Sequence, residues 1–230
     1  MSVLSKINLI LLRFFALIRA RGKYRLHEEL QPFSRDFGFH LGTPVDRFYI
    51  NSFIKSHEKD IHGTVYEIGD DQYSKRYAQR NSRIIILNEN IKHKYSFQVD
   101  LNGKNPHIYN TADCIILTQT LNFVYNFHNA INEVANILKS GGVCLITVAG
   151  ISQISRFDMN RWGDYWRFTN LSVQKMLERS FVNYTVEHFG NYYACANFLA
   201  GIPLENIEID LLTFVDADYQ LIIGARMVKD

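Results

Sequence analysis

Short apolar runs that alternate with helical stretches constrain the fold of this chain more than any other feature of its sequence. The first run, Thr64–Ile68, is rich in β-branched and aromatic residues and ends at the turn Gly69-Asp70-Asp71. Similar runs predict strands at 83–87, 95–99, 114–117 and 143–148. Residues 127–138 carry apolar side chains at helical spacing. Strands and helices that alternate in this way predict a parallel sheet.

The rest of the chain extends this pattern. Thr43 is predicted to be the N-cap of a helix that runs to about His57. The run 139–142, Lys-Ser-Gly-Gly, is predicted to end the helix at 127–138, with a glycine as its left-handed cap. Further helices are expected at 171–181 and 191–200, and further strands near 184–188 and 219–227. The predicted fold class is α/β, with a doubly wound, seven-stranded, mostly parallel sheet whose last strand is antiparallel.

The composition indicates a globular protein with one substantial core. Of the 230 residues, 47% are hydrophobic and 21% charged, with only 4 prolines, which argues against a disordered chain. A net charge of +2 does not by itself indicate a nucleic-acid partner, because phosphate binding needs a concentrated basic face. Cys114, Cys144 and Cys195 form no C-x-x-C pair. We therefore predict no metal site and a cytoplasmic location.

Residues 1–42 are predicted to be an N-terminal helix and connector, separate from a main domain at 43–230. Arg13 and Arg19 interrupt the apolar run at 7–20 well short of the roughly 20 uncharged residues that a membrane-spanning helix needs. An amphipathic helix within 4–21 would suit peripheral contact with an anionic inner membrane. The alternative is a helix packed on the domain or on another subunit, and the oligomeric state stays open.

Residues just beyond the predicted strands are the first candidates for ligand binding, because ligands of open parallel sheets bind there. Gly69 would let the backbone approach a ligand closely. Glu89 lies about 20 residues further on, where nucleoside-binding folds place an acid on the ribose hydroxyls. A solvated loop acid is the alternative for Glu89. Asp100, after the third strand, is a candidate for contact with the adenine edge.

Four short motifs mark the segment 63–150. They are E-I-G after the first strand, D-L after the third, D-C-I-I-L-T-Q-T-L on the fourth and L-K-S-G-G before the fifth. Together they resemble the core of class I S-adenosylmethionine (SAM)-dependent methyltransferases. The later run V-A-G-I-S-Q-I-S-R-F-D-M-N-R-W-G-D-Y-W-R-F-T is similar to a bacterial methyltransferase-domain group associated with glycosyltransferases and polysaccharide biosynthesis. The similarity extends from about Pro44 to the C-terminus.

The resemblance implies a Rossmann-like methyltransferase fold with SAM as cofactor. The cofactor-binding residues that it implies, together with the candidates above, are Glu67, Gly69, Asp70, Glu89, Asp100, Thr118 and Gln119. The family's glycine-rich turn is reduced here to one glycine, and Asp70, Asp71 and Tyr73 stand where small residues are usual. The two carboxylates would either repel the carboxylate of the cofactor or hold its ammonium group.

A second group of candidates follows the fifth strand and contains both tryptophans of the chain. Aromatic faces beside arginines and aspartates suit a sugar acceptor, and the arginines would bind a phosphate or carboxylate on it. The predicted acceptor-binding residues are Arg156, Arg161, Trp162, Tyr165, Trp166 and Arg167. The alternative is an aromatic lid packed on the core, with local ion pairs.

Methyl transfer from a sulfonium depends mainly on alignment, and a hydroxyl acceptor also benefits from one general base. Asp158 and Asp164 are the predicted bases, and His188 is a weaker candidate. The predicted function is methylation of a small-molecule or glycan-linked acceptor, at a hydroxyl, in polysaccharide or glycoconjugate biosynthesis. The main alternative is a catalytically inactive binding or scaffold subunit of a glycan assembly system. A dehydrogenase is a weaker alternative, because G-x-G-x-x-G is absent.

Overall fold

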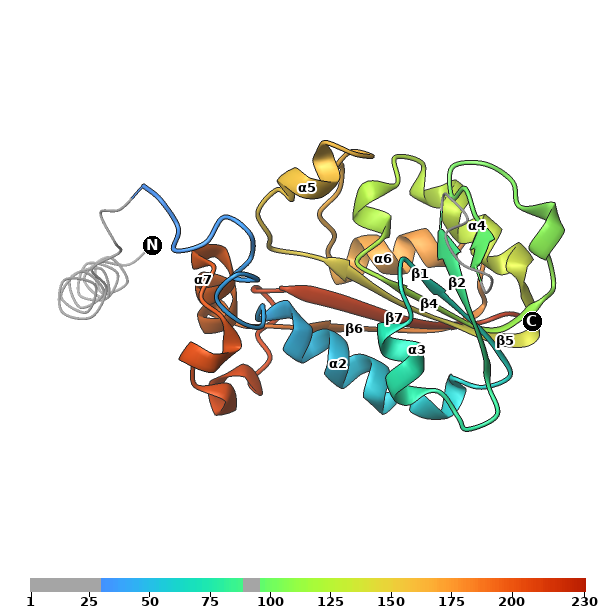
Figure 1. Ribbon diagram of the computed structural model, residues 1–230, viewed down its shortest axis with the longest axis horizontal. Coiled ribbons are helices and arrows are strands. Elements are labelled where there is room, and N and C mark those ends of the chain that lie inside the picture. Colours follow the sequence, from blue (N-terminus) through green and yellow to red (C-terminus); the bar gives the residue numbers. More distant parts are fainter. Residues whose placement is uncertain (1–29, 89–95) are drawn as a thin grey trace, which may run out of the picture. The chain divides into compact units, whose positions relative to one another are not determined.

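One mixed sheet organises the chain. The computed structural model describes residues 30–88 and 96–230. Within them the strands are β1 Thr64–Ile68, β2 Arg83–Asn88, β3 Ser96–Gln98, β4 Ala112–Thr118, β5 Leu138–Ala149, β6 Asn183–Phe189 and β7 Ile222–Val228. Their order across the sheet is β3-β2-β1-β4-β5-β7-β6 (Figure 1). The first five strands pair in parallel, and β7 runs antiparallel to β5 and β6. The predicted α/β fold class is confirmed.

Helices cover both faces of this sheet, and each face has its own hydrophobic core. The α-helices are α2 Asp46–Ser56, α3 Gln72–Tyr77, α4 Phe127–Ile137, α5 Arg156–Met159, α6 Asn170–Leu177 and α7 Tyr192–Ala200, and the 3-10 helices are η1 Glu58–Asp60, η2 Pro106–Ile108, η3 Leu121–Phe123, η4 Leu204–Asn206 and η5 Ile209–Leu212. Along β4, Ile115 and Leu117 join the core under α4 and α6, whereas Cys114 and Ile116 join the core under α2, α3 and α7 (Figure 1).

All the strands expected from the sequence are present, with small shifts at their ends. The predicted cap at Thr43 is wrong, because α2 begins at Asp46 with Val45 at its N-cap position. The Thr43 hydroxyl instead donates to Glu205 Oε1 at 2.7 Å, and this contact joins two segments that are distant in the sequence. A local cap pattern cannot anticipate such a partner.

The prediction that the run 139–142 caps helix α4 is also wrong. Leu138 already has an extended backbone, so α4 passes directly into β5. Gly141 has a φ of 74° inside that strand, and the pairing of β5 with β4 shifts register between Ala112 and Cys114. Gly141 therefore lies in the part of β5 where the regular pairing with β4 is interrupted. Lys139 pairs with Asp113 at 2.8 Å.

The compact unit that carries the sheet runs from Phe33 to Asp230. In the portions of the chain that the structure describes, none of the helices is both long and apolar enough to cross a membrane. The predicted amphipathic helix within 4–21 lies outside the described residues.

Candidate functional site

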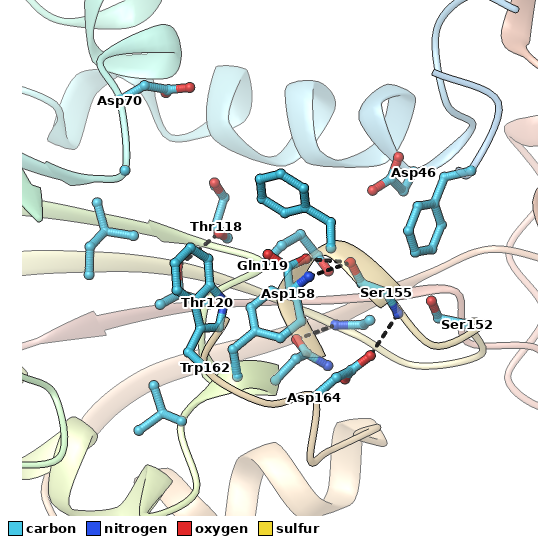
Figure 2. A pocket seen from close by; sticks show the side chains of 18 of the residues that line it. Asp46, Asp70, Thr118, Gln119, Thr120, Ser152, Ser155, Asp158, Trp162 and Asp164 are labelled. Carbon is cyan, nitrogen blue, oxygen red and sulfur yellow. Dashed lines mark hydrogen bonds between the residues drawn. The ribbon is translucent and has the colours of Figure 1, made fainter. Parts of the chain in front are cut away.

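A cavity of about 780 Å³ opens where the parallel strands end (Figure 2). Its walls include Ile68 of β1, Asn88 of β2, Thr118 of β4 and Ala149 of β5, each the last residue of its strand. Its volume lies within the range of small-molecule and cofactor sites. The position is the one expected for a ligand in an open α/β sheet.

The turn after β1 leaves room for a ligand. Gly69 lines the cavity with a φ of 88°, and a Cβ added there would meet no atom within 4 Å. The Asp70 carboxylate accepts a hydrogen bond from the Gln72 backbone N–H at 3.0 Å, so it is held against its own loop. Tyr73 is only 2% exposed, and its hydroxyl accepts from Arg47 Nη1 at 3.3 Å. Neither side chain closes the space at Gly69.

Glu67 stabilises this turn from its buried side. Its buried carboxylate accepts the backbone N–H groups of Tyr73 at 3.0 Å and Ser74 at 2.7 Å, at the start of α3. Burial raises the pKa of Glu67, although the hydrogen bonds from Ser74 and Tyr73 oppose the shift. Glu67 does not line the cavity. The structure therefore places this predicted cofactor residue behind the turn rather than on the cavity wall.

Asp100 lines the cavity beside apolar walls from β1, β2 and the loop after β3. Asn105 fixes its backbone: Asn105 Oδ1 accepts from Asp100 N, and Asn105 Nδ2 donates to Asp100 O, both at 2.9 Å. Glu133 of α4 in turn accepts from the Asn105 backbone N–H at 2.8 Å. Burial opposes ionisation of Glu133, but hydrogen bonds from Tyr109 and Asn105 outweigh it and lower its pKa. Glu89 lies outside the described residues.

The segment after β4 forms the floor of the cavity. Thr118, Gln119 and Thr120 all line it (Figure 2). Gln119 has a φ of 50°, a left-handed conformation that costs a non-glycine residue free energy. Its backbone N–H donates to Thr147 O at 2.8 Å, which ties the bend to β5. The predicted pair Thr118 and Gln119 is thus at the cavity, with a backbone strain that the sequence did not reveal.

The loop after β5 supplies the other end of the cavity. Ser155 Oγ donates to Asp158 Oδ2 at 2.5 Å, and the Ser155 backbone N–H donates to Asp164 Oδ2 at 2.8 Å (Figure 2). Arg167 donates to both oxygens of Asp164, whose side chain is fully buried. Asp164 therefore has both oxygens occupied by the loop, whereas the Asp158 carboxylate accepts a side-chain hydrogen bond from Ser155.

Only part of the second candidate group faces this cavity. Trp162 and Arg167 line it together with Asp158 and Asp164. Four other predicted acceptor residues do not line it: Arg156, Arg161, Tyr165 and Trp166. Trp166 Nε1 donates to Val124 O at 3.1 Å, and the Trp166 ring packs edge-on against Phe127. These contacts match the lid alternative for that tryptophan.

Two residues of the site were missed by reasoning from sequence. Asn122 is 2% exposed; it accepts from Ala149 N at 3.2 Å and donates to Trp166 O at 2.7 Å, so it fastens the loop after β5 to the cavity floor. Asp46 lines the cavity from the start of α2. Neither residue belongs to a recognisable motif, and both depend on contacts between distant segments.

Comparisons with known proteins agree with this architecture. Residues 63–146 match the sequence profile of a family described as a methyltransferase domain. This match supports the prediction of a SAM-dependent methyltransferase. No curated protein matches the chain at a significant level of similarity.

Solved structures share the fold at low sequence identity. A phosphoethanolamine N-methyltransferase 2 of Haemonchus contortus, in complex with SAM, is 13% identical with a TM-score of 0.51, over 79% of this chain and 52% of that chain. A SAM-dependent methyltransferase from Archaeoglobus fulgidus is 11% identical with a TM-score of 0.50, over 80% of this chain and 94% of that chain. The cyclase SpnF is 14% identical with a TM-score of 0.52, over 79% and 80%. This chain spans about half the length of the Haemonchus enzyme.

Proposed function

We propose that this chain transfers the methyl group of SAM to a hydroxyl of a small-molecule or glycan-linked acceptor. The observation that carries the proposal is the open space at Gly69, where backbone borders a cavity at the carboxyl ends of the strands. A nucleoside cofactor needs this close approach of backbone, and a side chain there would prevent it.

The cofactor would occupy the end of the cavity between β1 and the loop after β3. The backbone at Gly69 would approach the methionine part, and Asp100 would accept hydrogen bonds from the adenosine part. Ile68, Leu87 and Val99 supply apolar walls for a flat ring. SAM supplies an activated methyl group on a positively charged sulfur. The protein's part is then to align the acceptor with that methyl group and to exclude water.

The acceptor would occupy the end formed by the loop after β5. Phe157 and Trp162 offer aromatic faces there, and Ser152, Ser155 and Asp158 offer hydrogen-bonding groups. This mixture suits a sugar, which stacks through its C–H face and hydrogen-bonds through its hydroxyls. An acceptor in polysaccharide or glycoconjugate biosynthesis agrees with this chemistry.

Asp158 is the residue we assign as base. As the acceptor oxygen bonds to the methyl carbon, the carbon–sulfur bond breaks, its electron pair stays on sulfur, and the hydroxyl proton passes to Asp158. The hydrogen bond from Ser155 orients the Asp158 carboxylate. Asp164, paired with Arg167, would hold the loop rather than take the proton.

Calorimetric titration with SAM and with S-adenosylhomocysteine (SAH) tests the proposal. Micromolar binding of both, followed by transfer of a tritiated methyl group to sugars or nucleotide sugars, is the expected result. A folded protein that binds neither compound at high concentration would refute it and would favour the inactive scaffold. Comparison of surface glycans between producing cells and a knockout would identify the methylated product.

Peripheral contact with the inner membrane from the cytoplasmic side is a separate part of the proposal. It is supported by the apolar and basic sequence of residues 4–21. Deleting residues 1–21 should abolish co-sedimentation with anionic liposomes and leave SAH affinity unchanged. Liposome association that persists after the deletion would contradict this part alone.

A further inference from the structure

The loop after β5 carries two predicted acceptor residues that point away from the cavity. Neither Arg156 nor Arg161 lines it, and both are exposed, in or just after the short helix α5. Apolar side chains of the same segment are exposed beside them. Together these side chains form the α5 surface, which consists of Ile154, Arg156, Phe157, Arg161 and Trp162. The two arginines therefore require an explanation outside the cavity.

The apolar side chains of the α5 surface are largely accessible to solvent. Ile154 is 47% exposed, Phe157 58% and Trp162 43%. Figure 1 shows α5 on the outer side of its loop, clear of the sheet. Neighbouring exposed apolar side chains of this kind mark interaction sites. Phe157 and Trp162 also line the cavity, so the α5 surface begins at the rim of the cavity.

The acids of this loop are turned inward. Within residues 150–167 they are Asp158 and Asp164, and both line the cavity (Figure 2). The Asp164 side chain is fully buried and paired with Arg167, and Asp158 accepts a hydrogen bond from Ser155. The loop therefore contributes no carboxylate to the α5 surface.

The arginines of the α5 surface keep their positive charges unneutralised. Among the residues that the structure describes, no ion pair involves Arg156 or Arg161. Arg161 donates to the Phe157 carbonyl oxygen at 2.7 Å, and its guanidinium lies over the Phe157 ring, 3.3 Å from the ring centroid. Arg156 contacts only the Met159 sulfur, at 3.5 Å. The α5 surface thus combines two free cations with exposed aromatic rings.

An anionic lipid surface fits this combination. Tryptophan and phenylalanine side chains are favoured at the boundary between headgroups and acyl chains. Arginine side chains bury their apolar stems there while the guanidinium reaches the lipid phosphates. The negative potential of a cytoplasmic leaflet attracts each such cation.

A second exposed apolar area shows that exposure alone does not carry this argument. Leu211 is 51% exposed and Phe214 67%. The segment 205–218 around them contains five acids and no base; the acids are Glu205, Glu208, Asp210, Asp216 and Asp218. An anionic membrane would repel that segment. Charge therefore distinguishes the α5 surface from it.

We propose that the α5 surface docks on an anionic membrane and turns the rim of the cavity toward the lipid. Phe157 and Trp162 belong to both the rim and the docked surface, so an acceptor carried on a membrane lipid would enter the cavity directly from the membrane. This preference for a lipid-linked glycan over a free sugar rests on the proposed methyl transfer. The surface is small, and a single weak anchor gives only marginal binding, so it acts together with the contact proposed for residues 4–21.

Neutralising the two arginines in the full chain tests the docking. Arg156→Gln with Arg161→Gln should weaken binding to vesicles of phosphatidylcholine and phosphatidylglycerol about 10- to 100-fold. SAH affinity should stay unchanged, because neither arginine lines the cavity. Lys59→Gln with Arg80→Gln is the matched control: both residues are exposed and lie just before β1 and β2, at the sheet edge opposite the cavity. This control removes the same charge and should bind vesicles like the wild type.

The two tryptophans report where the membrane approaches. Trp162 is exposed, whereas Trp166 is half-buried and donates to Val124 O. Vesicles with brominated acyl chains should quench the tryptophan emission of the wild type. Trp162→Phe leaves Trp166 as the sole tryptophan, so it should lose most of this quenching. Equal quenching in both proteins would overturn the docking of the α5 surface.

Membranes from knockout cells test the preference for a lipid-linked acceptor. With SAM that carries a tritiated methyl group, label should enter the solvent-extractable lipid fraction in preference to water-soluble sugars. Arg156→Gln with Arg161→Gln should reduce the label in the lipid fraction. Label that enters only water-soluble sugars would overturn this choice of acceptor.

Each remaining outcome counts against a definite claim. Unchanged vesicle binding without the two arginines would leave the contact to residues 4–21 alone, and equal weakening in both double variants would show an effect of net charge only; either result overturns the docking. Self-association without vesicles that the Arg156→Gln and Arg161→Gln changes abolish, seen by analytical ultracentrifugation, would assign the surface to a second copy instead. Wild-type protein that does not bind SAH would refute methyl transfer and the lipid-linked acceptor, while the vesicle measurements would still decide the docking.

Discussion

Replacing Gly69 with valine should weaken cofactor binding far more than it weakens the fold. A Cβ added at residue 69 meets no atom within 4 Å outside its chain neighbours, so the substitution begins in open space. The φ of 88° still disfavours a β-branched residue. Gly141 offers a matched control, because its φ is 74° and it too has no atom within 4 Å of an added Cβ, yet it does not line the cavity.

The expected magnitudes follow from these two facts. A left-handed conformation costs a non-glycine residue about 1–3 kcal/mol, so both Gly69→Val and Gly141→Val should lower the melting temperature by about 2–4 °C per kcal/mol. Of the two variants, only Gly69→Val places its side chain at the cavity, where we propose that the cofactor approaches the backbone. Loss of even one hydrogen bond to the charged methionine part, at about 1.5–3 kcal/mol, weakens binding about 10- to 100-fold.

Calorimetric titration with SAH and a thermal melt of each variant make the comparison. Gly69→Val should show a normal cooperative melt and little or no binding, and Gly141→Val should bind SAH like the wild type. Unchanged SAH affinity in Gly69→Val would remove this turn from the site. Equal loss of affinity in both variants would show that backbone strain, rather than the occupied cavity, is responsible.

Three further predictions concern the loop and the far end of the sheet. Asn122→Ala should lower stability by about 1–3 kcal/mol, because it leaves the buried Ala149 N–H unpaired, whereas the Trp166 carbonyl keeps its hydrogen bond from Arg167; an unchanged melting temperature would contradict this. Asp158→Asn should cut turnover about 10²- to 10⁴-fold with little change in SAM affinity. Asp164→Asn should chiefly lower the melting temperature. Full activity in both variants would exclude both aspartates as bases. The hydrogen bond from Arg226 lowers the pKa of Asp60. The stability advantage of wild type over Asp60→Asn should therefore be present at neutral pH and be lost as the pH falls below 3.8. A constant difference in denaturant midpoint from pH 7 to pH 2 would contradict this prediction.

Several site residues were accessible from the sequence because local signals mark them. A β-branched run that ends at a glycine predicts a strand end, and the structure places Gly69 directly after β1, on the cavity wall. Asp100, Thr118 and Gln119 also follow strands that hydrophobic patterning predicts, and all three reach the cavity. Strands of a parallel sheet bring their carboxyl ends to one edge, so the order of elements gathers these residues.

Other roles depended on neighbours that no local pattern specifies. Of the two tryptophans in the second candidate group, Trp162 lines the cavity and Trp166 bonds to the backbone of a different loop. The sequence predicted the same acceptor-binding role for both tryptophans, but the two side chains differ in orientation and in burial. Glu67 similarly follows the family pattern, yet its carboxylate turns away from the cavity to hold the start of α3.

Hydrophobic periodicity and turn chemistry, which are properties of adjacent residues, were thus enough to specify the strands, the helices and the α/β class from the sequence alone. The tertiary structure decided which polar groups are buried and which have partners. Asp46 and Asn122 become part of one site only because α2, the segment after β4 and the loop after β5 meet around one cavity. Burial and hydrogen bonding are relations between distant segments, so the order of residues along the chain does not contain them in a form that local rules can extract.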